Sequence, residues 1–138
     1  MAKAGPAVRS KLLTVSDVTD LVGTRIRPDA LSQKETLPAI AYTQLISDHL
    51  QGLTGPVGLS VARIVVGCFA DTHVDAENLG DKVRLALDGE SGTFGSETVD
   101  ICILEEMDHD YLAPTDASDK GLYVTNLTFS ITLDEATS

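Results

Sequence analysis

The sequence predicts an α+β fold, a mainly antiparallel sheet with helices packed on one of its faces. Two apolar stretches, Leu37–Leu50 and Val57–Asp71, flank the short turn Gln51–Pro56, which predicts a long hairpin. An amphipathic segment, Thr72–Gly89, follows at once and has helical periodicity. The stretch Leu122–Leu133 then alternates between apolar and polar residues, as a half-buried strand does. At 138 residues, we expect a single domain over 1–138.

The N-terminal part of the chain predicts only short elements. Residues 1–15 are expected to be flexible, because Gly5 and Pro6 interrupt an early helix and leave one helical turn over Ala7–Leu13. Ser16 suits the N-cap of a short helix that ends before Gly23. Residues 25–27 are predicted to form a short strand that ends at Pro28, and residues 29–36 are expected to form a polar loop.

Both strands of the hairpin predict a mostly buried sheet. In the first strand neither face is fully polar, which indicates cover on both sides over part of its length. Its predicted faces are Ile40, Tyr42, Gln44 and Ile46 on one side, and Ala39, Ala41, Thr43 and Leu45 on the other. The return strand alternates in the same way, with Ala62, Ile64, Val66 and Cys68 opposite Val61, Arg63, Val65 and Phe69.

The helix after the hairpin has the clearest pattern. Thr72 and Asp75 have the spacing of a capping box, with Asp in place of Glu or Gln. One helical face is apolar and is expected to pack in the core; it consists of Ala76, Leu79, Val83, Ala86 and Leu87. Gly80 weakens the helix by ~1 kcal/mol relative to Ala. The sequence leaves open whether this glycine allows a close approach to the sheet.

The C-terminal half predicts two strands and two loops. Glu90–Glu97 is a predicted loop, and Thr98–Glu105 is a predicted strand with Val99, Ile101 and Ile103 on one face. Glu106–Lys120 is long, acidic and contains a proline, so we expect a loop, and a loop of this length is usually functional or mobile. The last strand is expected to place one face in the core and one in water. Residues 134–138 are expected to fray.

Composition restricts the function. The net charge of −11 comes from 21 acidic and 10 basic residues, which disfavours a wrapping contact with DNA. An acidic surface suits either simple solubility or a channel through which DNA passes without sticking. No apolar run approaches the ~20 residues that span a bilayer, and the first residues lack the apolar core of a signal peptide. We therefore expect a protein of the cytoplasm, or of a particle assembled there.

The sequence shows no recognisable catalytic, cofactor-binding or metal-binding residues. Cys68 and Cys102 lie in strand-like runs and are expected to be buried and reduced. The segment Met107–Tyr111 is the one cluster that resembles a ligand set, but neighbours in an extended chain point to opposite sides. A single cation could not readily collect Asp108, His109 and Asp110. We expect His49 and His73 at the surface.

The order of these features resembles the tail-terminator, or tail-completion, proteins of long-tailed bacteriophages. The similarity covers residues 21–130 and rests on order and spacing more than on any one motif. The resembling segments are Leu21–Pro28, Leu37–Tyr42, Ser47–His49, Gly52–Pro56, Leu85–Gly89 and Gly121–Tyr123. The family's longer N-terminal helix is short or broken here.

The resemblance implies a structural virion protein of the tail, without enzyme activity or cofactor. It would form a homo-hexameric ring at the head-proximal end, cap the tail tube protein and dock the head-completion connector, while DNA passes through the lumen without specific binding. Candidate partner contacts lie at the hairpin tip and in the acidic loop: Asp48, His49, Gln51, Leu53, Thr54, Pro56, Glu106, Asp108, His109, Asp110 and Tyr111. The alternative is a small-ligand binding or accessory α+β module.

Overall fold

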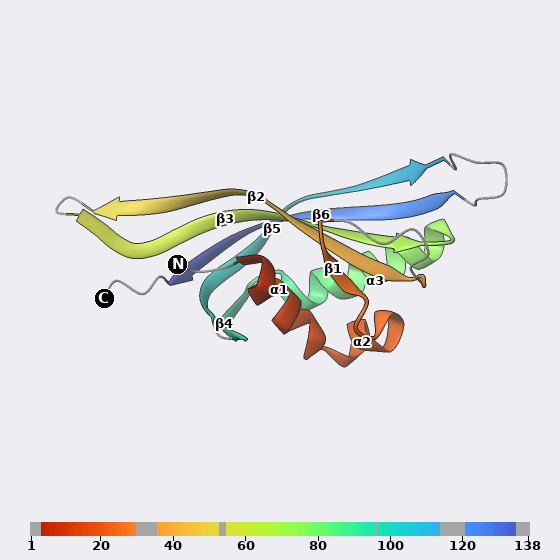
Figure 1. The fold of residues 1–138 in the computed structure, drawn as a ribbon, viewed down its shortest axis with the longest axis horizontal. Coiled ribbons are helices and arrows are strands. Elements are labelled where there is room, and N and C mark those ends of the chain that lie inside the picture. The colour runs from red at the N-terminus through yellow and green to blue at the C-terminus, as the bar shows by residue number, and fades with distance from the viewer. Residues whose placement is uncertain (1–3, 30–35, 53–54, 96, 114–120, 135–138) are drawn as a thin grey trace.

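The computed structural model describes residues 4–29, 36–52, 55–95, 97–113 and 121–134, and describes side chains over these ranges except for 46–59 and 134. Figure 1 shows three helices under one layer of strands. The elements in chain order are α1 (Ala4–Leu13), α2 (Ser16–Val22), β1 (Ile26–Pro28), β2 (Ala39–Gly52), β3 (Gly55–Ala70), α3 (His73–Leu87), β4 (Glu90–Phe94), β5 (Glu97–Leu112) and β6 (Leu122–Asp134).

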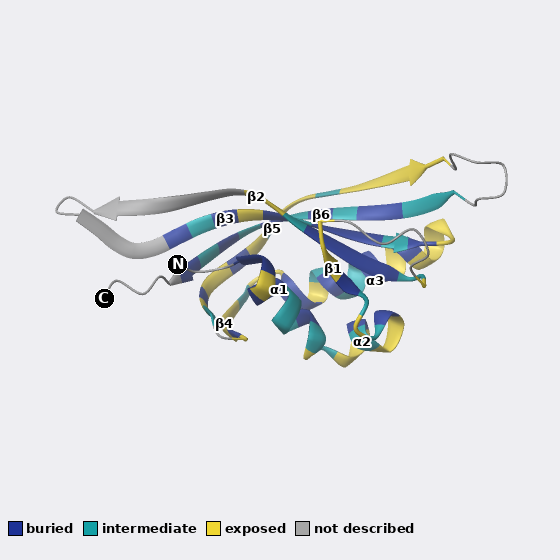
Figure 2. Ribbon diagram, viewed as in Figure 1, coloured by how far each residue is buried: buried dark blue, intermediate teal, exposed yellow. Residues whose placement is uncertain are grey.

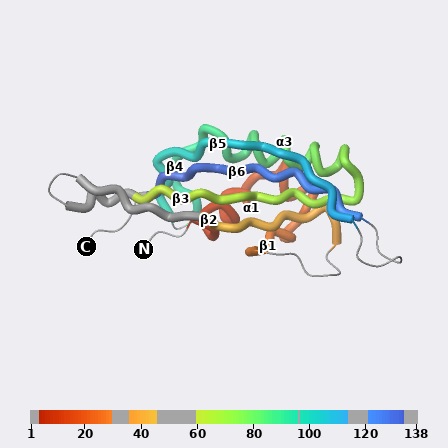
Figure 3. The backbone as a smooth tube through the Cα atoms, turned by 90° about the horizontal axis from the view of Figure 1, so that it is seen from above, coloured from red at the N-terminus to blue at the C-terminus, as the bar shows by residue number. Residues whose placement is uncertain are grey.

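The six strands form one sheet in the order β1-β2-β3-β6-β5-β4. All neighbours are antiparallel except β1, which is parallel to β2. Figure 3 shows the long strands side by side with the helices behind them. The predicted α+β class, with a long hairpin and helices on one face, is therefore confirmed.

The core lies between the sheet and the helices. One of the two predicted faces of β3 and one face of β6 are buried there, with Ile64, Val66, Phe129 and Ile131 fully enclosed. The apolar face of α3 packs against them as predicted, and all five of its residues are buried. The hydroxyl oxygen of Thr72 caps the helix by accepting a hydrogen bond from the Asp75 backbone N–H at 3.1 Å.

Gly80 allows α3 to lie close to the sheet. A Cβ atom at this position would sit 2.6 Å from Cγ2 of Thr125 on β6, far inside normal contact distance. Glycine therefore lowers the helix propensity at this position, but its lack of a Cβ atom lets the helix approach the strand closely.

The helical turn predicted over Ala7–Leu13 is confirmed, but it is part of a longer helix, α1, which begins at Ala4, so the prediction that Gly5 and Pro6 interrupt a helix is wrong. Pro6 lies in the first turn of the helix, where its missing N–H costs no intrahelical hydrogen bond. Gly5 lies against the ring of Tyr42 and leaves room for that ring. Val8 and Leu12 are then fully buried in the core.

Two smaller predictions concern the start of α2 and the C-terminal residues. The N-cap of α2 is Val15, without a side-chain hydrogen bond, and Ser16 is already the first helical residue. At the other end β6 continues through Asp134, and residues 135–138 lie outside the described ranges.

The predicted loop Glu90–Glu97 contains a strand, β4, which pairs with the first part of β5. The prediction that Val99, Ile101 and Ile103 share one face of β5 is also wrong: Val99 and Cys102 are buried, whereas Ile101 is 38% exposed and Ile103 is 48% exposed. The cause is a register shift between Val99 and Ile101, which inserts one residue and reverses the alternation.

Candidate partner-contact surfaces

The hairpin of β2 and β3 is longer than predicted. Gln51 pairs with Pro56 and Gly52 with Gly55, so the strands continue through most of the predicted turn. Asp48 and His49 are strand residues within the ladder. Leu53 and Thr54, the remaining candidates for contacts at this tip, lie outside the described residues.

The hairpin also continues past the end of the neighbouring strand. Among the described residues, the β3–β6 ladder ends at the pair Leu59 and Asp134. Beyond this point β3 still pairs with β2 as far as Gly55, so the hairpin continues as a two-stranded ribbon (Figure 1). A two-stranded ribbon is marginally stable in water by itself.

The predicted acidic loop is wrong over Glu106–Leu112, which belongs to β5 and pairs with β6 along its whole length. Charged residues hide the strand signal, because only alternate residues here are apolar or aromatic. The remainder of that predicted loop, beyond Ala113, falls in residues 114–120, which the structure does not describe.

Within β5 the acidic and the aromatic side chains take opposite faces. Asp108 accepts a hydrogen bond from the amide Nδ2 of Asn126 at 3.2 Å on the open face, away from the helices. Met107 packs against the core on the helix face. By the same alternation Glu106 and Asp110 belong to the open face, and the segment is exposed in Figure 2.

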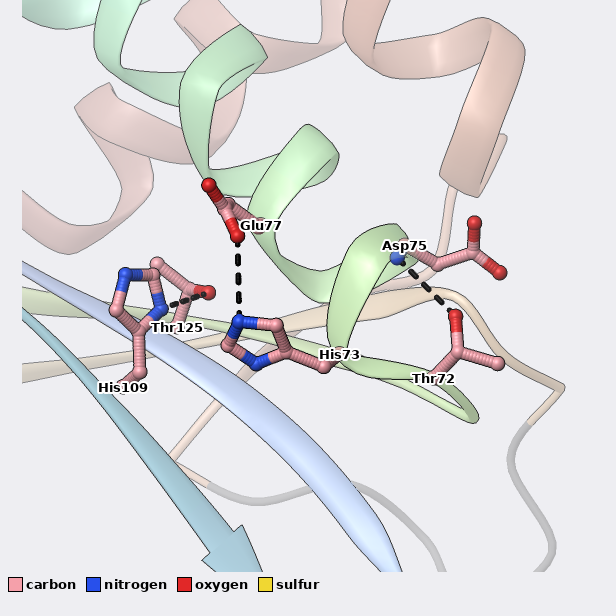
Figure 4. Close-up of polar contacts among 6 residues, drawn as sticks. All are labelled: Thr72, His73, Asp75, Glu77, His109 and Thr125. Atoms are coloured by element: carbon pink, nitrogen blue, oxygen red, sulfur yellow. Dashed lines mark hydrogen bonds and ion pairs between the residues drawn. The ribbon is translucent and has the colours of Figure 1, made fainter.

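His109 lies on the helix face and joins α3 to the sheet. Its Nδ1 is 3.0 Å from the hydroxyl oxygen of Thr125, and its ring centroid is 5.4 Å from that of His73 (Figure 4). His73, at the exposed start of α3, places Nε2 3.2 Å from a carboxylate oxygen of Glu77. These contacts connect the first turn of α3 to the β5–β6 pair.

A second aromatic contact continues this arrangement toward the end of the strands. The ring of Tyr111 on β5 lies 4.9 Å, centroid to centroid, from the ring of Tyr123 on β6.

Within the described ranges, no group of three or more His, Cys, Asp or Glu side chains is placed to hold a metal ion. Asp108 and His109 are on opposite faces, as the sequence predicts for neighbours in an extended chain.

Both cysteines are free and buried, as predicted. Removal from water raises the pKa of the Cys68 thiol far above its usual range. Burial, with smaller contributions from the carboxylates of Asp88 and Glu90, raises the pKa of Cys102 to about 12. Since the thiolate is the reactive form, neither cysteine is poised as a nucleophile at neutral pH.

The open face of the sheet carries apolar side chains that the sequence prediction did not assign to a surface. Leu45 on β2 is 56% exposed, and Ile101 and Ile103 on β5 are also exposed. Arg63 and Glu105 form an ion pair of 3.1 Å between them, partly in water. The signal in the sequence is the apolar content of both faces of these strands, which indicates a second apolar surface on the sheet.

Comparison with known proteins agrees with the fold. A chain from a solved structure, the virion of a native gene transfer agent particle, superimposes with a TM-score of 0.66 at 16% sequence identity. The match covers 95% of this chain and 94% of that chain. At this identity the similarity shows a shared fold.

None of the described helices has the length and apolar character needed to cross a membrane. No curated protein matches the sequence significantly. The profile of one family, described as tail completion protein gp17, matches residues 6–134, which is almost the whole length. The chain therefore belongs to the tail completion protein gp17 family.

Proposed function

We propose that several copies of this chain, six by resemblance to phage tail terminators, close into a ring at the head-proximal end of a phage tail. The ring ends growth of the tail tube and presents its other side to the head-completion connector. The observation that carries this proposal is the family match over residues 6–134, which makes the chain a structural tail protein. In this role the chain catalyses no reaction.

The shape of the sheet supports a ring. A closed ring needs one surface patch that contacts a different patch on the next copy. The described sheet ends in two unlike edges: β1 beside β2 on one side, and β4 beside β5 on the other. The short outer strands leave parts of β2 and β5 at the margin, where edge residues are available for contacts.

The charge of the chain supports a passage for DNA without specific binding. Between Glu97 and Leu112 the strand β5 contains six carboxylates and no Lys or Arg. Repulsion from such a surface keeps a polyanion from adhering to the wall. We place the extended hairpin at contacts with the tube or the connector.

The test is to image particles assembled without this chain. Tails of uncontrolled length are expected, because nothing would stop addition of tube subunits, or tails of normal length that do not join heads. Supplying the wild-type chain in the same cells is the control and should restore complete particles. Tails of normal length that join heads normally would refute the proposal. A ligand-binding role would then be the leading hypothesis.

A further inference from the structure

Two segments at opposite edges of the sheet differ in charge. Pairing with β4 ends at Cys102, and beyond it β5 is itself the edge of the sheet and carries four carboxylates, Glu105, Glu106, Asp108 and Asp110. At the other edge, the segment Thr24–Asp29 around β1 carries Arg25 and Arg27 against a single carboxylate, Asp29. An acidic edge and a more basic edge on the same molecule are complementary when identical copies stand side by side.

Arg27 and Asp108 lie at the same height at these opposite edges. Successive strand pairings define one rung across the sheet, which runs through Arg27, Ala41, Gly67, Asn126 and Asp108. Arg27 belongs to the open face because its neighbour Ile26 is buried toward the helices. Asp108 belongs to the same face, where it accepts its hydrogen bond from Asn126. The two charges therefore match in height and in face.

An apolar pair matches in the same way, a few residues along the strands. The pairings define a second rung through Ile46, Arg63, Ser130 and Ile103. Leu45 precedes this rung at a register shift in β2 and is exposed, as Ile103 is. Each edge thus presents a charged side chain and, a few residues along the strand, an apolar one.

A contact between these edges would form through side chains, because some of the backbone groups needed to continue the hydrogen-bond ladder are missing or already bonded. Pro28 has no N–H to donate, and the carbonyl oxygen of Ile26 already accepts from Nε of Arg9 at 3.1 Å. At the other edge the N–H of Leu104 donates to a carboxylate oxygen of Asp88 at 2.9 Å. Such protected edges resist uncontrolled strand pairing.

We infer that, in the ring of the proposed function, the β5 edge of one copy packs against the β1–β2 edge of the next. Asp108 faces Arg27, and Ile103 faces Leu45. Rotating one copy onto the next about a ring axis parallel to the strands changes neither the position of a residue along that axis nor the face of the sheet on which it lies. Identical copies therefore bring these side chains together. An unrelated partner would not need the matched rungs. Since β1 and β2 run opposite to β5, the two edges meet antiparallel.

Cross-linking tests this contact. The chain carrying Leu45→Cys and Ile103→Cys is treated with a short bifunctional thiol reagent, both as concentrated purified protein and within particles. A ladder of dimer, trimer and larger species is expected, because each copy contributes a different edge to each neighbour. The wild-type chain is the control for Cys68 and Cys102, which are buried. A second control pairs Ile103→Cys with Asp17→Cys on the exposed side of α2.

The charge match is tested on the same readout. Adding Arg27→Glu to the cross-linking variant places like charges at the contact and is expected to reduce the ladder about threefold or more. Adding Asp108→Arg as well reverses both charges and is expected to restore the ladder. Circular dichroism checks that each variant remains folded.

The outcomes separate this contact from the proposed function. A ladder in either sample, sensitive to Arg27→Glu and restored by the double reversal, supports the contact. Absence of a ladder in both samples overturns the contact, even where particles without the chain have defective tails. A ladder in purified protein, with normal particles lacking the chain, supports the contact and refutes the role in the tail.

Discussion

Replacing Leu87 with alanine is expected to lower the free energy of unfolding by about 2–5 kcal/mol. Leu87 is fully buried at the end of α3, where its side chain fills space between the helix and the sheet. Truncation removes apolar surface from the core and leaves a cavity that the neighbours fill only in part. Chemical denaturation, followed by far-UV circular dichroism, measures the loss.

Leu85 provides a matched control in the same helix. Its side chain is 63% exposed, so Leu85→Ala removes the same atoms from a surface position. Its effect should stay within about 0.5 kcal/mol. If Leu87→Ala and Leu85→Ala had equal effects, the face of α3 that contains Leu87 would not pack on the sheet.

Replacing Gly80 with alanine is expected to destabilise the protein by about 1–3 kcal/mol, the usual cost of overpacking. In an exposed helix this substitution would stabilise by ~1 kcal/mol. Here the added Cβ would lie 2.6 Å from Cγ2 of Thr125 and 3.1 Å from its Cβ, so the helix must move from the strand. The sign of the effect therefore distinguishes a packed glycine from an exposed one.

Thr125→Ser tests the cause of this effect. Serine removes Cγ2 but keeps the hydroxyl that contacts Nδ1 of His109. In that background Gly80→Ala should cost less, with a coupling energy of about 0.5–3 kcal/mol in a double-mutant cycle. A cost that is the same in both backgrounds would mean that Thr125 does not set the spacing between helix and strand.

Local periodicity explains which parts of the fold could be predicted. The buried face of α3 and the alternation of β6 depend on spacings within one segment, and both predictions are confirmed. The predicted hairpin strands also pair, because both are apolar and a turn connects them. The insertion of β6 between β3 and β5 depends on contacts far apart in the sequence, which no local pattern contains.

The mistaken predictions have physical causes of the same kind. Glu106–Leu112 has the alternation of a strand, but its acidic residues at a sheet edge resemble a solvated loop. The register shift after Val99 changes which side chains are buried, and only pairing with β6 reveals it. Gly5 and Pro6 suit a helix because of where they lie in it and what they contact.

The faces on which two of the candidate contact residues lie could be predicted. The sequence places Asp108 and His109 on opposite faces, and their partners Asn126 and Thr125 agree. The correspondence of Arg27 with Asp108 depends on the register of five strands and could not be obtained from the sequence.

The most direct test of the capping role is to add the purified chain to tails that are still growing in its absence. Electron microscopy gives the distribution of tail lengths over time, with buffer addition as the control. If the chain caps the tube, lengths should stop increasing on addition, and the stopped tails should become able to join heads. Continued growth at the rate of the control, with no gain in head joining, would contradict the capping role.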